Sequence, residues 1–363
     1  MLKIYNTLSK KIEDFIPINK SHIKIYVCGP TVYDKIHIGN ARPLVVFDTF
    51  VRLLRYKYPK VTYVRNITDV DDKINDRLIS EKITLKDLTD KTINDFQKDC
   101  TSLNNLYPDY EPRATEHISE MIKMIENLIL NEFAYLSKGH VLFNIKKFPE
   151  YGSLSNRTLD EMISGSRVEI ADYKINPGDF VLWKPSEKNI PGWESPWGRG
   201  RPGWHIECSA MSKKYLGVQF DIHGGGADLI FPHHENEIAQ SRCANNSNSL
   251  ANYWMHNGYV NIDNVKMSKS LKNFVSISEL LNKFKGETIR YFLLQSHYRA
   301  PLNFSNNSLL EANTSLSSLY RSVEDLSVNG DPDNEILTNL EDDVNTPKVF
   351  SRLHYLSEQA NKG

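Results

Sequence analysis

Long apolar runs are absent from this sequence of 363 residues, and cysteine is scarce. No hydrophobic stretch approaches the ~20 residues that a membrane-spanning helix needs, so we expect no membrane association. The first 20 residues mix acidic with basic side chains and lack the apolar segment of a secretion signal. The four cysteines, Cys28, Cys100, Cys208 and Cys243, are irregularly spaced. They indicate reduced thiols in the cytoplasm, where cysteine more often binds metal or does chemistry than forms disulfides.

The chain also lacks an excess of charge, because its formal net charge is −1. Nucleic-acid binders are often basic, since phosphate contacts need Lys and Arg. The net charge therefore argues neither for nor against a nucleic-acid partner. Any such partner would have to be bound by a local patch of basic residues. Hydrophobic residues make up 40% of the chain and charged residues 25%, the balance of a globular protein long enough for two or more domains.

The first part of the chain alternates between strand and helix patterns. A short β-rich apolar run covers residues 23–28, and a helical pattern covers 41–58. Asn40 is the expected N-cap of that helix, and Pro43 is expected in its first turn. A second strand is expected at 61–67, followed by a helix that opens with acidic residues. This order predicts a parallel α/β domain.

The middle of the chain changes character. A helical pattern follows at 112–130, and a shorter, β-like pattern covers 139–184. Residues 185–204 hold four prolines, four glycines and three tryptophans, which predicts a loop leaving an inserted domain. A strand that ends in glycines is expected at 218–226. From 276 onward the pattern is helical, with no strand signal.

The stretch FPHHENE, residues 231–237, raises the question of a metal site. On a helix, both His233 and His234 lie close enough in sequence to pair with Glu237. One His and one Glu are too few for zinc, but Cys28 and Cys208 could meet them at the edge where parallel strands end. The alternative is a solvated helix start, with the cysteines as small buried hydrophobes.

Two short segments could contact phosphate. HIGN, residues 37–40, lies between the first strand and the first helix, where free N–H groups bind phosphate and Gly39 permits close approach. KMSKS, residues 266–270, carries Lys266 and Lys269 on an expected loop that could neutralise developing charge. Taken separately, each has a simpler explanation that its local features favour: an ordinary strand-to-helix turn for HIGN and a solvated charged loop for KMSKS.

Read together, HIGN and KMSKS resemble the two signature motifs of class I aminoacyl-tRNA synthetases. The sequence is most similar to the cysteinyl-tRNA synthetase family within that class, over roughly residues 22–350. The likeness rests on five segments in the family's order: YVCGPTVYDKIHIGNAR, YVRNITDVDDKI, RPGWHIECSAM, FDIHGGGADLIFPHHENEIAQS and KMSKSLKNF.

The resemblance implies a Rossmann-like nucleotide-binding parallel sheet with an inserted connective domain, followed by a mostly helical C-terminal region. The implied catalytic domain has a first half at 1–115 and a second half at 203–250, separated by the connective domain at 116–202. A stem-contact region with the KMSKS loop follows at 251–315, and the start of a helical anticodon-end domain at 316–363. Family members continue further, so the chain is a truncated or short member. Adenylate formation is expected to be intact and tRNA charging weakened.

The resemblance also implies one zinc ion, held by Cys28, Cys208, His233 and Glu237. His234 is not an implied ligand and, with Glu235, reverts to the solvated helix start. The implied zinc takes the thiolate of the substrate cysteine as an added ligand, which discriminates against serine without an editing site.

For ATP, the resemblance implies that His37, Gly39 and Asn40 lie at the phosphates, with Mg²⁺ travelling with the nucleotide. Members often carry His at the fourth position of the motif, where this chain has Asn40, so the share of Asn40 in charge stabilisation is smaller. Lys266 and Lys269 would stabilise the transferred phosphorus and the leaving pyrophosphate.

The implied pocket for the substrate cysteine is lined by Thr68 and Trp204. Asp228 is a weaker candidate for contacting the ammonium group or the ribose. The glycines at 224–226 would let the backbone approach the nucleoside.

The implied function is a cytoplasmic, monomeric cysteine–tRNA ligase with ATP, L-cysteine and tRNA(Cys) as its partners. A related alternative is the cysteine ligase of mycothiol synthesis, which uses the same adenylate chemistry but an amino sugar as acceptor. An alternative from a different class is a non-catalytic tRNA-binding relative. The presence of all four implied zinc ligands and of both lysines of KMSKS argues against this alternative.

Overall fold

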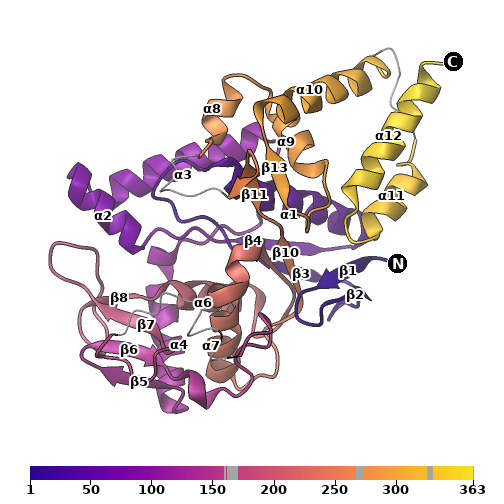
Figure 1. Cartoon of the computed structure of the whole chain (residues 1–363). Coiled ribbons are helices and arrows are strands. Elements are labelled where there is room, and N and C mark those ends of the chain that lie inside the picture. Colours follow the sequence, from indigo (N-terminus) through magenta and orange to yellow (C-terminus); the bar gives the residue numbers. More distant parts are fainter. Residues whose placement is uncertain (159–160, 162–170, 267–273, 325–329, 363) are drawn as a thin grey trace.

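The computed structural model describes residues 1–158, 161, 171–266, 274–324 and 330–362 (Figure 1). Its central sheet has four parallel strands in the order β10–β9–β3–β4. These strands are β3 (Ile23–Val27), β4 (Val61–Arg65), β9 (Phe220–Gly226) and β10 (Ala251–Asn257). The predicted parallel α/β fold is confirmed.

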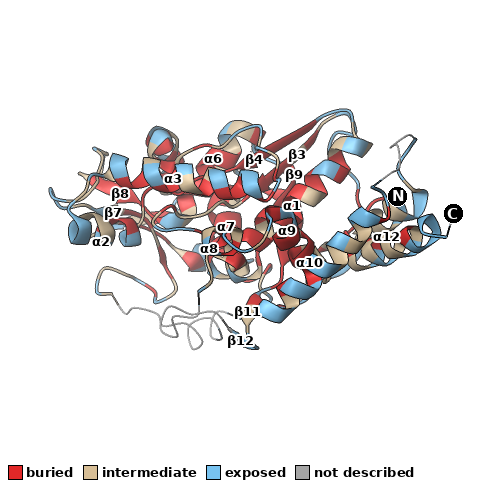
Figure 2. Ribbon diagram, turned by 90° about the horizontal axis from the view of Figure 1, so that it is seen from above, coloured by how far each residue is buried: buried red, intermediate tan, exposed pale blue. Residues whose placement is uncertain are grey.

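Helices cover both faces of the central sheet, which explains why its strands are apolar along most of their length. Every residue of β4 and β9 is buried, and Figure 2 shows these strands in the red of buried residues. Side chains alternate between the faces. The helices are α1 (Ile38–Lys57), α4 (Ile118–Leu130), α6 (Trp204–Leu216) and α7 (Glu235–Asn245). Ile25 and Val27 share a hydrophobic core with α1, whereas Tyr26 on the opposite face packs with α4, α6 and α7.

A second, antiparallel sheet lies at the end of the molecule away from α8 and α10 (Figure 1). Its strands are β5 (Ala134–Ser137), β6 (His140–Phe143), β7 (Phe180–Pro185) and β8 (Gly200–Pro202). Of two short 3₁₀ turns nearby in the chain, Ala114–His117 leads into α4 and Ile145–Lys147 follows β6. The predicted loop at 185–204 is wrong in part, because β8 pairs there with β7. Three residues among prolines and glycines show no alternating pattern.

The region after β10 differs from its prediction in two ways. A strand occurs where only helices are expected, since β13 (Leu302–Phe304) pairs with β11 (Val260–Ile262), which also pairs with β12 (Val265–Lys266). The expected domain boundary at 250 is also too early, because β10 belongs to the central sheet. The helices are α8 (Ile277–Leu281), α9 (Gly286–Leu294), α10 (Asn306–Arg321), α11 (Asn334–Glu341) and α12 (Thr346–Ala360).

An N-terminal hairpin of β1 (Lys3–Asn6) and β2 (Lys11–Asp14) precedes β3 and was not predicted. It lies beside β10, where the N–H of Thr7 donates to the carbonyl of Trp254 over 2.8 Å. The acidic stretch after β4 forms the predicted helix α2 (Asp72–Glu81), capped by Asp71, and α3 (Leu85–Ser102) follows it. The hairpin ties the start of the chain to the far edge of the central sheet.

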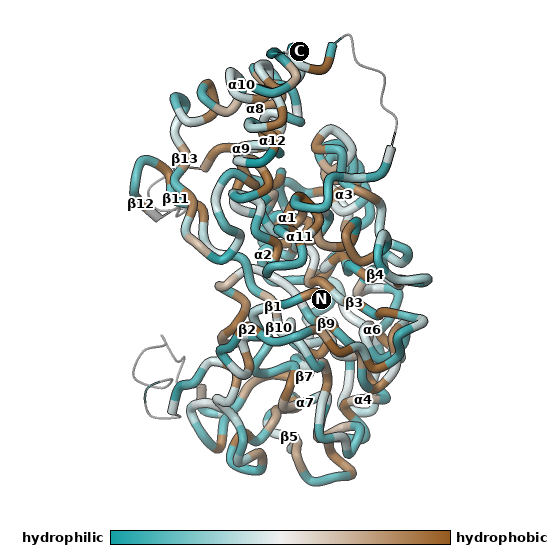
Figure 3. Tube along the Cα trace, turned by 90° about the vertical axis from the view of Figure 1, so that its right-hand side faces the viewer, coloured by the Kyte–Doolittle hydropathy of each residue, from teal (hydrophilic) through white to brown (hydrophobic). Residues whose placement is uncertain are grey.

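The outer helices are amphipathic. Figure 3 shows hydrophobic and hydrophilic residues interspersed along α10 and α12, and α10 buries only Leu309 and Ala312. Among the residues that the structure describes, no helix is both long and apolar enough to cross a membrane.

Close packing of α1 on β9 generates a first prediction. A Cβ added at Gly224 would lie 2.4 Å from the ring of Phe47 on α1. Because the helix would have to move away from the sheet, we expect Gly224→Ala to lower the free energy of unfolding by about 1–3 kcal/mol in urea titrations. The matched control is Gly226→Ala, where the added Cβ meets only the carboxylate end of Asp228, which can rotate. Equal stability of the two variants would contradict the prediction.

Candidate active site

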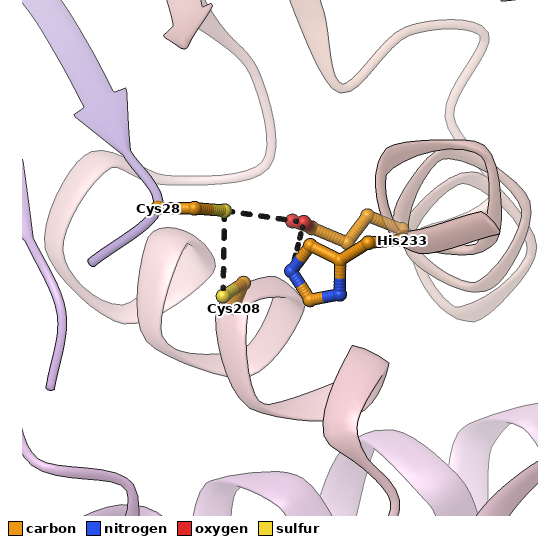
Figure 4. A group of neighbouring side chains, drawn as sticks. Cys28, Cys208 and His233 are labelled. Carbon is orange, nitrogen blue, oxygen red and sulfur yellow. Dashed lines mark hydrogen bonds and ion pairs between the residues drawn. The ribbon is translucent and has the colours of Figure 1, made fainter. Parts of the chain in front are cut away.

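Four metal-ligating side chains meet at the carboxyl edge of the central sheet (Figure 4). Cys28 follows β3, Cys208 lies in α6, His233 precedes α7 and Glu237 lies in its first turn. One ligand atom from each lies within 4.8 Å of all the others. The two Sγ atoms are 3.7 Å apart, Cys28 Sγ is 3.5 Å from Glu237 Oε1, and His233 Nε2 is 3.0 Å from the same oxygen. The structure thus brings together the four residues implied as ligands.

The fold explains this convergence. Cys28 lies on the same face of the sheet as Tyr26, two residues earlier, and that face packs against α6. The backbone N–H of Cys28 donates to the carbonyl of Gly224, which fixes the end of β3 against β9. His233 is the fourth of the five residues in a short π-helical segment, Ile230–His234, that runs into α7, and its side chain meets that of Glu237, four residues later.

The electrostatics of the cluster favour a bound cation. Burial alone would raise the pKa of Glu237, but His223 and His233 outweigh it and lower that pKa to about 2. Burial would likewise lower the pKa of His233, but Glu237 and Cys208 raise it to about 10. The hydrogen bond from Cys28 lowers the pKa of Cys208 to about 6, whereas burial raises that of Cys28. Two thiols, an imidazole and a carboxylate are a donor set compatible with zinc.

A second donor set overlaps the first. Cys28, His223, His234 and Glu237 also place one ligand atom each within 4.8 Å of one another. His234 Nε2 is 3.3 Å from Cys28 Sγ, and His223 Nε2 is 2.9 Å from Glu237 Oε2. The expected solvated helix start is therefore wrong for His234 and Glu235, which are fully buried. Exposure of a helix start depends on what packs over it, and here residues 154–155 do so by donating backbone N–H groups to Glu235.

Further histidines surround the cluster without having been predicted. His205 Nδ1 lies 2.9 Å from His233 Nδ1, and His256 Nε2 lies 2.8 Å from His234 Nδ1. His223, His205 and His256 lie singly in apolar or mixed segments and carry no local pattern. Only the burial of a polar ring inside a strand such as β9 could have singled one out.

Two residues expected in the amino-acid pocket lie next to the cluster. Trp204 begins α6, stacks on His233 with ring centroids 4.3 Å apart and is 40% exposed, so it lies between the cluster and solvent. Thr68 is buried just after β4 and donates its hydroxyl to Glu207 Oε2 over 3.0 Å. Asn66 connects Thr68 to the end of β3, since it accepts from the N–H of Gly29 and donates to the hydroxyl of Thr68.

Asp228 is the exception among the expected pocket residues. It lies in the 3₁₀ turn Ala227–Leu229 after β9, where it is exposed, and its carboxylate faces Gly226. The described contacts do not join it to the thiols, Thr68 or Trp204.

The HIGN segment forms the first turn of α1, and the expected N-cap is wrong. His37 is the N-cap, with its Nδ1 accepting from the N–H of Asn40, while Asn40 Oδ1 accepts from the N–H of His37. Gly39 is the second helical residue and Pro43 the sixth, beyond the first turn. Histidine is rarely considered as a capping residue, but an unprotonated ring nitrogen is a good acceptor. Burial lowers the pKa of His37 to about 4, so the ring is neutral at physiological pH.

The segment that follows KMSKS is attached to the same turn. The N–H of Ile38 donates to the carbonyl of Val275, and the N–H of Ile277 donates to the carbonyl of Ile36. The ring of Phe274 stacks on His37 with centroids 5.0 Å apart. Of the two expected lysines, Lys269 lies outside the described residues, and for Lys266 only its backbone position at the end of β12 is described.

Comparison with known proteins identifies the family. A family model for the catalytic domain of class I (C) tRNA synthetases matches residues 14–314. A cysteine–tRNA ligase from Rhodospirillum rubrum is 53% identical over 365 residues, covering 99% of this chain and 80% of that protein. One from Paramagnetospirillum magneticum is 54% identical over 367 residues, with the same coverage. The chain belongs to the cysteine–tRNA ligase family.

Membership of the cysteine–tRNA ligase family confirms the predicted family and enzyme class, and it does not favour the mycothiol alternative. The solved structure of Mycobacterium tuberculosis methionyl-tRNA synthetase with methionyl-adenylate matches with a TM-score of 0.68. It is 14% identical, and the match covers 94% of this chain and 82% of that one. At this identity the likeness shows the fold alone.

The capping role of His37 generates a second prediction. Its pKa is lowered from 6.5 to about 4, so between these values the unfolded chain binds a proton that the folded chain does not. Stability is therefore lost as the pH falls through this window. We expect His37→Asn, which keeps a capping acceptor but cannot titrate, to reduce the pH dependence of the unfolding free energy by up to about 1 kcal/mol per pH unit. Urea unfolding at pH 4.5, 5.5 and 6.5 measures it, and parallel slopes in the two proteins would count against it.

Proposed function

We propose that this chain activates L-cysteine with ATP to cysteinyl-adenylate and transfers the cysteine to the 3′ end of tRNA(Cys). Cys28, Cys208, His233 and Glu237 would hold one Zn²⁺, through which the substrate would be selected by its thiol. The observation that supports this selection most strongly is the buried cluster of donors at the carboxyl edge of the sheet, with Trp204 over His233. Ligand sites of parallel α/β sheets lie at that edge.

The donor set fits zinc because it combines thiolate, imidazole and carboxylate within one small buried volume. When bound, the ion supplies a Lewis acid that takes the thiolate of cysteine and disfavours the weakly acidic hydroxyl of serine. Trp204 excludes water from this position. The hydroxyl of Thr68 donates to Glu207 and accepts from Asn66, so one lone pair of its oxygen is left to accept from the substrate ammonium. Asp228 would contact the ammonium or the ribose from the end of β9.

For ATP we assign the phosphates to the start of α1. Nδ1 of His37 accepts from Asn40, so the neutral ring carries its proton on Nε2, which is free to donate to a phosphate oxygen. Gly39 leaves room for the phosphate to approach its own N–H, because the N–H groups of Ile38 and Asn40 already donate to Val275 and His37. The side chain of Asn40 is used in the cap, so its part is mainly to hold His37. Lys266 and Lys269 complete the charge stabilisation, and Mg²⁺ accompanies ATP.

The reaction then has two steps. A carboxylate oxygen of cysteine bonds to the α-phosphorus while the bond to the bridging oxygen breaks, and pyrophosphate leaves with the electron pair. A hydroxyl of the terminal ribose of tRNA next attacks the acyl carbon, and AMP leaves. Positioning and charge stabilisation supply most of the rate enhancement in such displacements.

We assign the domains as the family resemblance implies, except that the second half of the catalytic domain ends at 257 and not at 250. The catalytic domain comprises residues 1–115 and 203–257, which supply all four strands of the central sheet, and residues 116–202 form the connective domain. Residues 258–315 contact the tRNA stem, and 316–363 begin the anticodon-end domain. We expect the protein to act as a monomer in the cytoplasm, which light scattering coupled to gel filtration and cell fractionation would check.

Cysteine substitutions test the assignment of the cluster. We expect Cys208→Ala to lower cysteine-dependent ATP–pyrophosphate exchange and tRNA(Cys) charging by at least about 100-fold, because one of four zinc ligands is lost. Cys243→Ala is the matched control, since this thiol is also buried but lies outside the cluster and should change either rate only a few-fold. Exchange that survives in Cys208→Ala would refute the zinc assignment, and discharge of the adenylate onto an amino sugar in place of tRNA would refute the acceptor.

Proton release on metal binding provides a further test. His233, with a pKa raised to about 10, and Cys28, with a raised pKa, both hold protons in the metal-free protein at neutral pH. Zn²⁺ must displace these protons, so its apparent affinity falls as the pH falls below about 10. We expect about two protons released per ion at pH 7, measured by titration calorimetry in buffers of different ionisation enthalpy. A binding enthalpy that is the same in every buffer would rule this out.

A further inference from the structure

Behind the proposed zinc ligands, three side chains form a continuous line of hydrogen bonds. His234 Nε2 is 3.3 Å from the sulfur of Cys28, and His234 Nδ1 is 2.8 Å from His256 Nε2. His256 Nδ1 is in turn 2.8 Å from the hydroxyl of Thr7. The line therefore runs from the metal site, through the start of α7 and the strand β10, to the hairpin at the N-terminus.

Burial keeps both imidazoles of this line neutral. His234 is completely buried and His256 is 6% exposed. Burial lowers the pKa of His256 to about 3. A neutral imidazole has one donor and one acceptor nitrogen, so the direction of one hydrogen bond in the line fixes the direction of the others.

A thiolate at Cys28 selects one direction, because it can only accept. His234 then donates from Nε2 to the sulfur, and its Nδ1 must accept from the Nε2–H of His256. The Nδ1 of His256 accepts from the hydroxyl of Thr7, which has a rotatable proton to give. Every bond in the line is satisfied in this arrangement, which is the one required when Cys28 binds a metal.

We propose that His234, His256 and Thr7 are positioning residues that hold a hydrogen-bond donor against the sulfur of Cys28 and so stabilise its metal-bound thiolate. The inference rests on the proposed zinc site. It gives His234 a role as a donor to a ligand, not as a ligand, although His234 belongs to the second donor set. The occupied Nδ1 of His234 fits the general rule that residues behind metal ligands fix their orientation and tune their basicity.

Metal release and spectroscopy test the line without relying on activity. The probe is wild-type protein loaded with Zn²⁺, from which a chromophoric chelator withdraws the ion, and the same protein loaded with Co²⁺. In His256→Leu the donor to His234 is lost, and we expect Zn²⁺ release to be about 10-fold faster and the thiolate-to-Co²⁺ charge-transfer band to shift. His256→Gln offers an amide N–H in place of the ring N–H and should restore most of both properties. One metal ion per chain should remain bound in each variant.

A second pair of variants lies at the far end of the line, on the half-buried Thr7, where the fold is least at risk. Thr7→Val removes the hydroxyl at nearly constant volume and should change release in the same direction by a smaller factor, whereas Thr7→Ser should leave it unchanged. Wild-type release rates and an unshifted band in both His256→Leu and Thr7→Val would overturn the inference. So would loss of bound metal in His234→Ala together with its retention in Cys208→Ala, because His234 would then be a ligand. A wild-type protein that takes up neither ion would instead disprove the proposed zinc site, and the inference with it.

Discussion

The parallel pairing of β3 with β9 is the constraint on which the rest of this molecule depends. It brings the end of β3 beside the glycines of β9, where the N–H of Cys28 donates to Gly224. Parallel strands end at a common edge, so this register places Cys28 beside the segment leading into α7, and the pairing of β3 with β4 adds Thr68 at the same edge. Helix α6, which carries Cys208 and Trp204, then packs against the face of the sheet that carries Cys28. The same pairing that closes the core thus also assembles the site.

Assembly of so many titratable groups in the core has a thermodynamic consequence. Taking a charge out of water costs several kcal/mol unless it is paired. Here Glu237 is paired with both His223 and His233, each through a different carboxylate oxygen. Among the described residues, Nδ1 of His223 is nevertheless one of the buried polar atoms that have no hydrogen-bond partner. A metal ion that binds only the folded chain adds its binding free energy to stability, which offsets this cost.

Much of the fold could be predicted from the sequence because its signals are local. Apolar runs such as 23–28 and 218–226, and the acidic start of α2, indicate strands and a helix without knowledge of their neighbours. Strands β8 and β13 could not be predicted, since three residues carry no periodicity. The cap of α1 was misassigned because His37 accepts through a ring nitrogen and so does not resemble the usual capping residues. For the site, residue spacing alone did not decide whether a metal is bound. The resemblance of five segments to the cysteinyl-tRNA synthetase family then implied four particular ligands. The histidines behind them depend on which side chains pack together, which no local pattern reveals.

The separation of these residues along the chain has a consequence for biosynthesis. Cys28 and its partner Glu237 are 209 residues apart, so at roughly 5–20 residues per second a nascent chain carries the thiol of Cys28 for about 10–40 s before Glu237 has been made. Pairing of β3 with β9 must wait equally long, and such distant strand pairs form slowly even in a complete chain. During this interval β3, β4 and α1 expose apolar surface, and the thiol of Cys28 is unprotected. Translation of this chain therefore requires a reducing environment and protection from aggregation until its second half has emerged from the ribosome.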